Sequence, residues 1–202
     1  MDIATSRTRL RRLFSQTVEG PSVTALARLG VTPNQITILG LLIAGVAAYL
    51  MTKGWFLAAG LVLLSSGFLD LLDGALARRT GQATPFGAVL DSVSDRVGEA
   101  AVFLGILIFY QARGDTLAVV LSYVALVTSF MVSYARSRAE AVGVTGAVGF
   151  AGRAERILIL SIALIAGYPV PALGVISALA TVTFVHRVYH VWRTTDRAKA
   201  AR

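Results

Sequence analysis

Residues 70–95 read DLLDGALARRTGQATPFGAVLDSVSD and hold four of the chain's eleven acidic residues. These four are Asp70, Asp73, Asp91 and Asp95. They lie in two segments that are otherwise apolar enough to span a membrane, where a carboxylate costs several kcal/mol unless it is paired, hydrated or bound to a metal. Four clustered acids would also repel one another, and the nearby fixed cations are Arg78, Arg79 and Arg96. The stretch therefore predicts a site for a divalent metal ion.

The spacing of the acids favours one shared site. Asp70 and Asp73 stand at i, i+3 and Asp91 and Asp95 at i, i+4, so each pair lies on one face of a helix. Residues 79–86 combine Thr, Gly, Gln and Pro, which is typical of a turn, and two antiparallel helices joined there would bring the pairs face to face. Carboxylates suit hard cations such as Mg²⁺ or Mn²⁺. With no Cys and only two His, both near the C-terminus, we do not expect a zinc or thiolate site.

Two glycines, Gly74 and Gly87, accompany the acidic pairs. Glycine is unfavourable inside a helix, so its presence beside each pair favours a function. Bare backbone at these positions would let a bulky ligand approach the acids. From the residues alone, a buried salt-bridge cluster or an ion-conducting site stays open as an alternative.

The stretch resembles the signature of the CDP-alcohol phosphotransferases, which is Asp-x-x-Asp-Gly-x-x-Ala-Arg, eight residues, then Gly-x-x-x-Asp-x-x-x-Asp. Every fixed position is present at the family's spacing. The resemblance implies that a CDP-activated lipid or alcohol donates a phosphate-linked group to an acceptor hydroxyl and that CMP is released. It also implies Mg²⁺ or Mn²⁺ as cofactor, with two cations in each active site.

The resemblance also assigns roles to residues. Asp70, Asp73 and Asp91 become metal ligands, and Asp95 becomes a ligand, the general base, or both, so that Asp91 and Asp95 are the expected catalytic residues. The expected CDP-binding set is Asp70, Gly74, Ala77, Arg78, Thr84, Asn34 and Thr37. Arg78 would contact a phosphate. Asn34 and Thr37 match a recurring family opening of the first span, although a helix cap at Thr32-Pro33-Asn34 is an alternative explanation for them.

Composition indicates an all-α integral membrane protein. The chain has 202 residues, of which 55% are hydrophobic and 15% charged, and a mean hydropathy of +0.70. We expect six transmembrane helices near 34–52, 55–78, 86–111, 116–138, 154–168 and 172–192. An amphipathic juxtamembrane segment over residues 1–32 would precede a catalytic domain at 33–193, and residues 194–202 would form a basic tail.

The basic residues predict the orientation in the membrane. With a cytoplasmic N-terminus, every Lys and Arg except Lys53 and Arg113 falls in a cytoplasmic segment or an adjoining helix end. Both termini and the acidic cluster would then face the cytoplasm, where a soluble nucleotide has access. The net charge of +8 is explained by this topology and by anionic lipid, so we expect no nucleic-acid partner.

The acceptor is predicted from basic residues later in the chain. Arg136, Arg153, Arg156 and Arg193 would form an anion pocket beside the metals. The run from Ser133 to Ala141 and the Glu155-Arg156 pair resemble the actinobacterial phosphatidylinositol-phosphate synthases, although arginine at position 136 departs from the more frequent lysine. That resemblance implies CDP-diacylglycerol as donor, inositol 1-phosphate as acceptor, and a homodimer.

Other functions compete with this interpretation. Glycerol 3-phosphate also carries a phosphate, so a phosphatidylglycerophosphate synthase or another CDP-alcohol phosphotransferase is the main alternative. A divalent-cation carrier and a structural scaffold are the distant ones. Glu99 continues the Asp91–Asp95 spacing by one turn, and we expect it to pair with an arginine rather than to lie near the metals.

Overall fold

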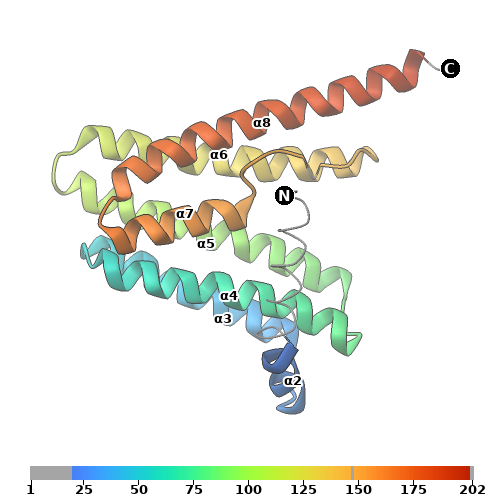
Figure 1. Cartoon of the computed structure of the whole chain (residues 1–202), viewed down its shortest axis with the longest axis horizontal. Coiled ribbons are helices and arrows are strands. Elements are labelled where there is room, and N and C mark those ends of the chain that lie inside the picture. Colours follow the sequence, from blue (N-terminus) through green and yellow to red (C-terminus); the bar gives the residue numbers. More distant parts are fainter. Residues whose placement is uncertain (1–19, 147, 201–202) are drawn as a thin grey trace, which may run out of the picture. The chain divides into compact units, whose positions relative to one another are not determined.

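The computed structural model describes residues 20–146 and 148–200, and the regular structure of these residues is entirely helical (Figure 1). Its helices are α2 Gly20–Arg28, α3 Pro33–Thr52, α4 Phe56–Thr80, α5 Pro85–Gln111, α6 Thr116–Ala141, α7 Arg153–Ala166 and α8 Pro169–Ala200. The all-α prediction is confirmed. Of the predicted juxtamembrane segment, residues 1–19 lie outside the described chain.

The helices begin and end where the sequence places breaks. At the start of α3, the Thr32 N–H donates to Gln35 Oε1 (2.9 Å) and the Gln35 N–H donates to Thr32 Oγ1 (3.4 Å). This reciprocal pair is a capping box, with Pro33 in the first turn where its missing N–H costs nothing. At the end of α7, Gly167 adopts a φ of 81°, a left-handed conformation that favours glycine and stops the helix.

Among the described residues, four helices are long and apolar enough to cross a membrane: 33–52, 56–80, 116–141 and 169–196. The predicted third and fifth spans differ from these. The helix α5 is long but carries Asp91, Asp95, Arg96 and Glu99, and α7 has only 14 residues, about 21 Å at 1.5 Å per residue, against about 30 Å of hydrocarbon. The helix α8 also passes the predicted end at 192 and continues through the predicted tail to Ala200.

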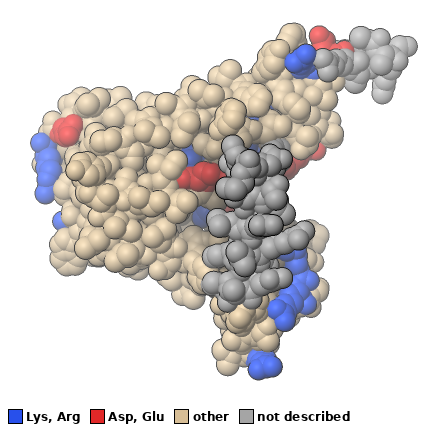
Figure 2. All heavy atoms as spheres, viewed as in Figure 1, with Lys and Arg blue, Asp and Glu red and all other residues tan. Residues whose placement is uncertain are grey.

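The exterior of the protein is apolar, as expected for contact with lipid. Large hydrophobic side chains that are more than half exposed occur on several of the long helices, for example Leu42, Leu57, Leu117 and Val182. Figure 2 shows charged side chains over only small parts of the visible face. Such extended apolar exposure is unusual for a water-soluble monomer and supports a multi-pass membrane protein.

The chain divides into two compact units. The first comprises Met1–Ile43 and Ser65–Val97, and the second comprises Ala44–Leu64 and Gly98–Arg202. The core of the first unit is formed by Val23, Ile36, Leu72, Ala75 and Leu76. The second unit buries a larger cluster that includes Met51, Leu63, Phe103, Ile106, Leu160, Leu164, Leu173 and Ile176. In this second unit α8 packs against α6 and α7 (Figure 1).

Two glycines allow close helix packing in the second unit. A Cβ on Gly60 of α4 would lie 2.8 Å from both the Ser161 carbonyl oxygen and Ile165 Cγ1 of α7. A Cβ on Gly105 of α5 would collide with the backbone carbonyl of Ala48 in α3. Small residues at such crossings let helix backbones approach closely, which is a main source of helix association in lipid.

Replacing Gly60 by Ala is therefore expected to destabilise the protein by about 1–3 kcal/mol, because a backbone oxygen cannot move aside as a flexible side chain does. The matched control is Gly45→Ala in α3, where an added Cβ meets no atom within 4 Å. Thermal unfolding in detergent should show a lowered midpoint for Gly60→Ala and an unchanged or raised one for Gly45→Ala. Equal midpoints for the two variants would contradict the close crossing of α4 and α7.

Candidate active site

The site is built around the turn between α4 and α5. Thr84 caps α5, because its Oγ1 accepts the N–H of Gly87 at 3.0 Å, and Pro85 follows at the first helical position. At the other side of the turn, Thr80 Oγ1 donates to the Leu76 carbonyl at 2.8 Å in the last turn of α4. The turn thus lies where the sequence predicted it and joins the two helices that carry the acids.

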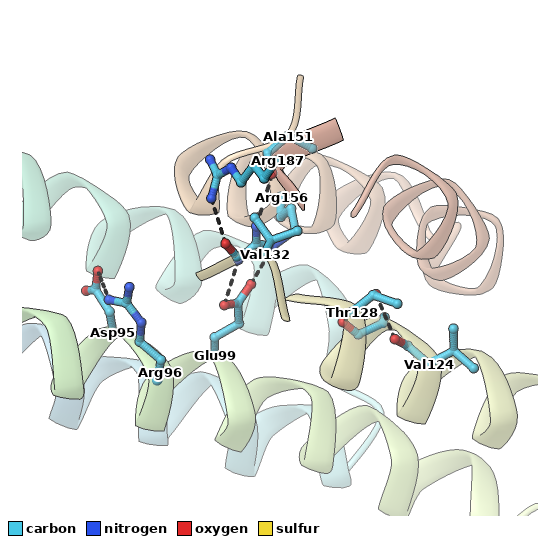
Figure 3. A network of polar contacts seen from close by, with 10 residues as sticks. Asp95, Arg96, Glu99, Val124, Thr128, Val132, Ala151, Arg156 and Arg187 are labelled. Carbon is cyan, nitrogen blue, oxygen red and sulfur yellow. Dashed lines mark hydrogen bonds and ion pairs between the residues drawn. The ribbon is translucent and has the colours of Figure 1, made fainter. Parts of the chain in front are cut away.

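Three of the four acids come together. Carboxylate oxygens of Asp70, Asp91 and Asp95 all lie within 4.8 Å of one another, and the three side chains are half-buried. Asp95 also contacts Arg96 Nη1 at 3.6 Å (Figure 3). The predicted meeting of the two motif halves is confirmed for these residues.

The fourth acid, Asp73, is placed differently. It is buried, and its Oδ2 accepts a hydrogen bond from Thr37 Oγ1 of α3 at 2.7 Å. Thr37 Oγ1 also lies 3.2 Å from the Pro33 carbonyl, within the same helix. Asp73 is not a member of the acidic group, so the structure brings together three of the four predicted metal ligands.

The donor set of this acidic group fits a divalent cation. It offers carboxylate oxygens only, which hard cations such as Mg²⁺ and Mn²⁺ prefer. Oxygens that share one Mg²⁺ at about 2.1 Å lie at most about 4.2 Å apart. The oxygens of Asp70, Asp91 and Asp95 are already within 4.8 Å of one another, so small side-chain adjustments would suffice to bind one ion.

A pocket opens beside the acids, and Asp91 belongs to both. The predicted CDP-binding residues that line it are Asn34, Thr37, Gly74, Ala77, Arg78 and Thr84, and Asp73 lines it as well. Pro33, Gln82, Ala83, Gly87 and Ala88 complete the lining. Asp70, the seventh predicted CDP-binding residue, lies in the acidic group instead and is absent from the pocket wall.

The two motif glycines shape this pocket. A Cβ on Gly87 would lie 3.1 Å from both Asn34 Oδ1 and Thr84 Oγ1, so glycine lets two polar side chains approach the backbone of α5. A Cβ on Gly74 would lie 3.3 Å from Arg78 Nη1. Gln82 also lines the pocket. It was not among the predicted site residues, and only its place in the predicted turn could have indicated it.

The arginines predicted to bind the acceptor occupy different environments in the second unit. Arg136 is exposed, with its Nε 2.8 Å from Glu140 Oε1 one helical turn later. Arg153 is the half-buried first residue of α7, and Arg193 is exposed on α8. Their convergence into one anion pocket stays a prediction.

The structure does not support the prediction that Arg156 binds the acceptor phosphate. Its Nε and Nη2 donate to the two carboxylate oxygens of Glu99 at 2.8 and 2.9 Å, and its Nη1 donates to the Ala151 carbonyl at 3.1 Å (Figure 3). Both side chains are only 1% exposed. A guanidinium enclosed in this way leaves no open face for an acceptor, so Arg156 has a structural place here. The expected pairing of Glu99 with an arginine is confirmed.

Comparison with known proteins agrees with the site. The sequence matches the CDP-alcohol phosphatidyltransferase family over residues 30–191. An archaetidylinositol phosphate synthase of Pyrococcus horikoshii is 42% identical over 165 residues, which cover 81% of this chain and 85% of the relative. A phosphatidylinositol phosphate synthase of Mycobacterium tuberculosis is 38% identical over 196 residues, which cover 91% of this chain and 89% of the relative.

Solved structures show the same similarity. A crystal structure of the Mycobacterium tuberculosis phosphatidylinositol phosphate synthase with CDP-DAG bound superposes with a TM-score of 0.78 at 34% identity, covering 87% of this chain and 94% of that one. A structure of the same enzyme in complex with manganese and citrate gives a TM-score of 0.79 at 34% identity, covering 87% and 89%. The chain therefore belongs to the CDP-alcohol phosphatidyltransferase family and is a membrane-bound transferase of phospholipid synthesis.

Proposed function

We propose that this enzyme transfers the phosphatidyl group of CDP-diacylglycerol to inositol 1-phosphate, giving phosphatidylinositol phosphate and CMP. The observation that carries the proposal is the position of Asp91, which belongs both to the acidic group and to the wall of the adjoining pocket. A nucleotide diphosphate in that pocket would have its phosphates beside the carboxylates. The similarity to synthases of inositol-phosphate lipids supports the choice of acceptor.

The pocket supplies the groups that a CDP moiety requires. Arg78 would donate charge-assisted hydrogen bonds to a phosphate. Ala77 and Gly74 leave room for the nucleotide because they carry little or no side chain. Asn34 and Thr84 present polar atoms at the N-terminus of α5. The hydrogen bond from Thr37 fixes the orientation of Asp73.

Asp70, Asp91 and Asp95 would hold the divalent cation, Mg²⁺ or Mn²⁺, and we propose two cations per site with Asp73 as a further ligand. Bound there, the metal would screen the pyrophosphate and activate the acceptor hydroxyl. Manganese in the related structure supports this assignment. The family membership gives no support to the carrier or scaffold alternatives.

The transfer needs one proton acceptor. The acceptor hydroxyl oxygen forms a bond to the phosphorus that carries the diacylglycerol, and the bond between that phosphorus and the CMP oxygen breaks. CMP leaves with the electron pair, and the hydroxyl proton passes to the Asp95 carboxylate. We assign the proton to Asp95 because it belongs to the acidic group and, unlike Asp91, does not line the pocket proposed for the nucleotide.

The phosphate of the acceptor requires cations, and we assign it to Arg136, Arg153 and Arg193. Free inositol or serine has no such need, whereas glycerol 3-phosphate does. The donor lipid has a second candidate, because an archaetidylinositol phosphate synthase is 42% identical to this chain. An archaetidyl donor would leave the chemistry at the acids unchanged and alter only the lipid tails.

The same proposal covers topology and assembly. Residues 33–193 would form a catalytic domain of six transmembrane helices, in which α5 and α7 complete the four long apolar ones. Residues 1–32 would lie along the cytoplasmic surface of the cell membrane, and residues 194–202 would form a basic cytoplasmic tail. The active site would face the cytoplasm, and two copies of the chain would form a homodimer.

The acceptor is tested by measuring CMP release from CDP-diacylglycerol with Mg²⁺. Inositol 1-phosphate, inositol, glycerol 3-phosphate and serine are supplied separately, and the panel is repeated with an archaetidyl donor. We expect release with inositol 1-phosphate alone. Its phosphate can bind the arginines, and inositol phosphate is the acceptor that the similar synthases indicate. Release with glycerol 3-phosphate instead would retain the reaction and overturn the acceptor.

Replacing Asp91 by Asn is expected to lower CMP release at least about 100-fold, because the amide removes one charge from both the metal site and the pocket wall. Mn²⁺ binding, followed by electron paramagnetic resonance, should weaken in parallel while the unfolding midpoint does not fall. Asp196→Asn, at an exposed position of α8, is the matched control and should behave as the wild type. Full activity of Asp91→Asn would refute the assignment.

Replacing Thr37 by Val tests the pocket wall, since it removes the hydroxyl that Asp73 accepts while it keeps the side-chain shape. We expect the KM for CDP-diacylglycerol to rise about tenfold, as for a buried acceptor left without its donor. Thr37→Ser retains the hydroxyl and should stay near the wild-type value. If both variants show the same KM, the hydrogen bond does not order the nucleotide site.

A further inference from the structure

In the connection between α6 and α7, the described residues 142–146 and 148–152 form no helix or strand, yet some of them are buried. Gly146 and Ala151 are buried, and Val148 is half-buried. Buried backbone groups need hydrogen-bond partners. Here the partners are side chains that project from α7 and α8, all within the second unit of the protein.

Three side chains hold this connection. Arg187 of α8 donates from Nε to the Val148 carbonyl at 2.8 Å. Ala151 is bound on both sides, since its N–H donates to Thr183 Oγ1 of α8 at 3.2 Å and its carbonyl accepts from Arg156 Nη1 at 3.1 Å. Gly149 has a φ of 116° and lies against the Thr183 side chain, so no larger residue fits there.

Arg187 also binds α6. Its Nη1 donates to the Val132 carbonyl at 2.7 Å, and its side chain is almost completely buried (Figure 3). One guanidinium thus joins α8, the connection and α6. Burying a charge is costly, and here hydrogen bonds to two main-chain carbonyls offset part of that cost. The planar guanidinium of arginine presents N–H donors in a fixed arrangement that can reach both carbonyls, whereas the compact ammonium of lysine does not. This geometry requires arginine.

The residues held in this way adjoin two arginines of the proposed acceptor site. Val132 lies one helical turn before Arg136. A Cβ on Gly146 would lie 2.7 Å from the Arg136 carbonyl oxygen and 2.9 Å from its Cα, so the connection packs directly on Arg136. At the other end, Arg153 follows the anchored Ala151 by two residues and begins α7.

We propose that Arg187 is a positioning residue for the acceptor subsite. Its guanidinium fixes the α6–α7 connection against α6 and thereby fixes Arg136 and Arg153, which bind the phosphate of the acceptor. The buried Glu99–Arg156 pair supports the same connection through Ala151. This inference rests on the proposed function, because that function assigns the phosphate to Arg136 and Arg153.

The test separates the two substrates. We expect Arg187→Gln to raise the KM for inositol 1-phosphate about tenfold and to leave the KM for CDP-diacylglycerol and the affinity for Mn²⁺ within about twofold. Arg187→Lys should give an intermediate KM because it can bind one carbonyl. Arg138→Gln, an exposed position on α6 outside the site, is the control and should match the wild type.

A second variant covers the case in which Arg187→Gln does not fold. Gly146→Ala changes no arginine but pushes the connection away from Arg136, so it should raise the same KM. Hydrogen exchange should be faster across residues 142–152 in the Arg187 and Gly146 variants and unchanged in the α4–α5 turn.

An unchanged KM for the acceptor in these variants, or an equal rise for both substrates, would overturn the inference alone. A wild-type enzyme that releases CMP with glycerol 3-phosphate would overturn the proposed acceptor, and the KM comparison would then decide the inference with that substrate. A wild-type enzyme that uses no phosphorylated acceptor would overturn both.

Discussion

Mutual repulsion among carboxylates is the constraint on which the active site depends. Carboxylate oxygens of Asp70, Asp91 and Asp95 lie within 4.8 Å of one another, and the three side chains are half-buried between α4 and α5. Like charges at that distance are unfavourable wherever water does not fully screen them. The short turn at 81–84, capped by Thr84, holds the acids together, and the binding of a cation would relieve the repulsion. The turn that brings the carboxylates together therefore also creates the need for a bound cation.

The local features of this site could be predicted from the sequence because they depend on residues close together in the chain. The i, i+3 and i, i+4 spacings, the turn between them and the cap at Thr32 follow from helix geometry alone. Six of the thirteen residues that line the pocket were expected there from the family resemblance. Asp73 was expected at the metals instead, and its hydrogen-bond partner Thr37 lies 36 residues away on another helix. Helix spacing relates residues three or four positions apart, so it could not predict this contact.

The arginines of the second unit show the same limit more sharply. In the sequence, Arg156 and Arg187 are indistinguishable from the arginines that anchor helix ends at a membrane surface. Burial separates them, because Arg156 meets Glu99 57 residues away and Arg187 meets a carbonyl 55 residues away. The short α7 agrees with the span expected near 154–168. The end of α8 was missed instead, since the helix passes the expected limit at 192 and continues to Ala200. Periodicity gives the type of an element better than its limits.

The Glu99–Arg156 pair has a consequence for how this sequence can evolve. Removal of one partner leaves a full charge buried without compensation, which typically costs 3–5 kcal/mol, whereas an apolar pair of similar volume is often tolerated. The two positions are therefore free to diverge only together, through intermediates that are less stable than either end point. That barrier can preserve an ion pair over long divergence whether or not the pair contributes to catalysis.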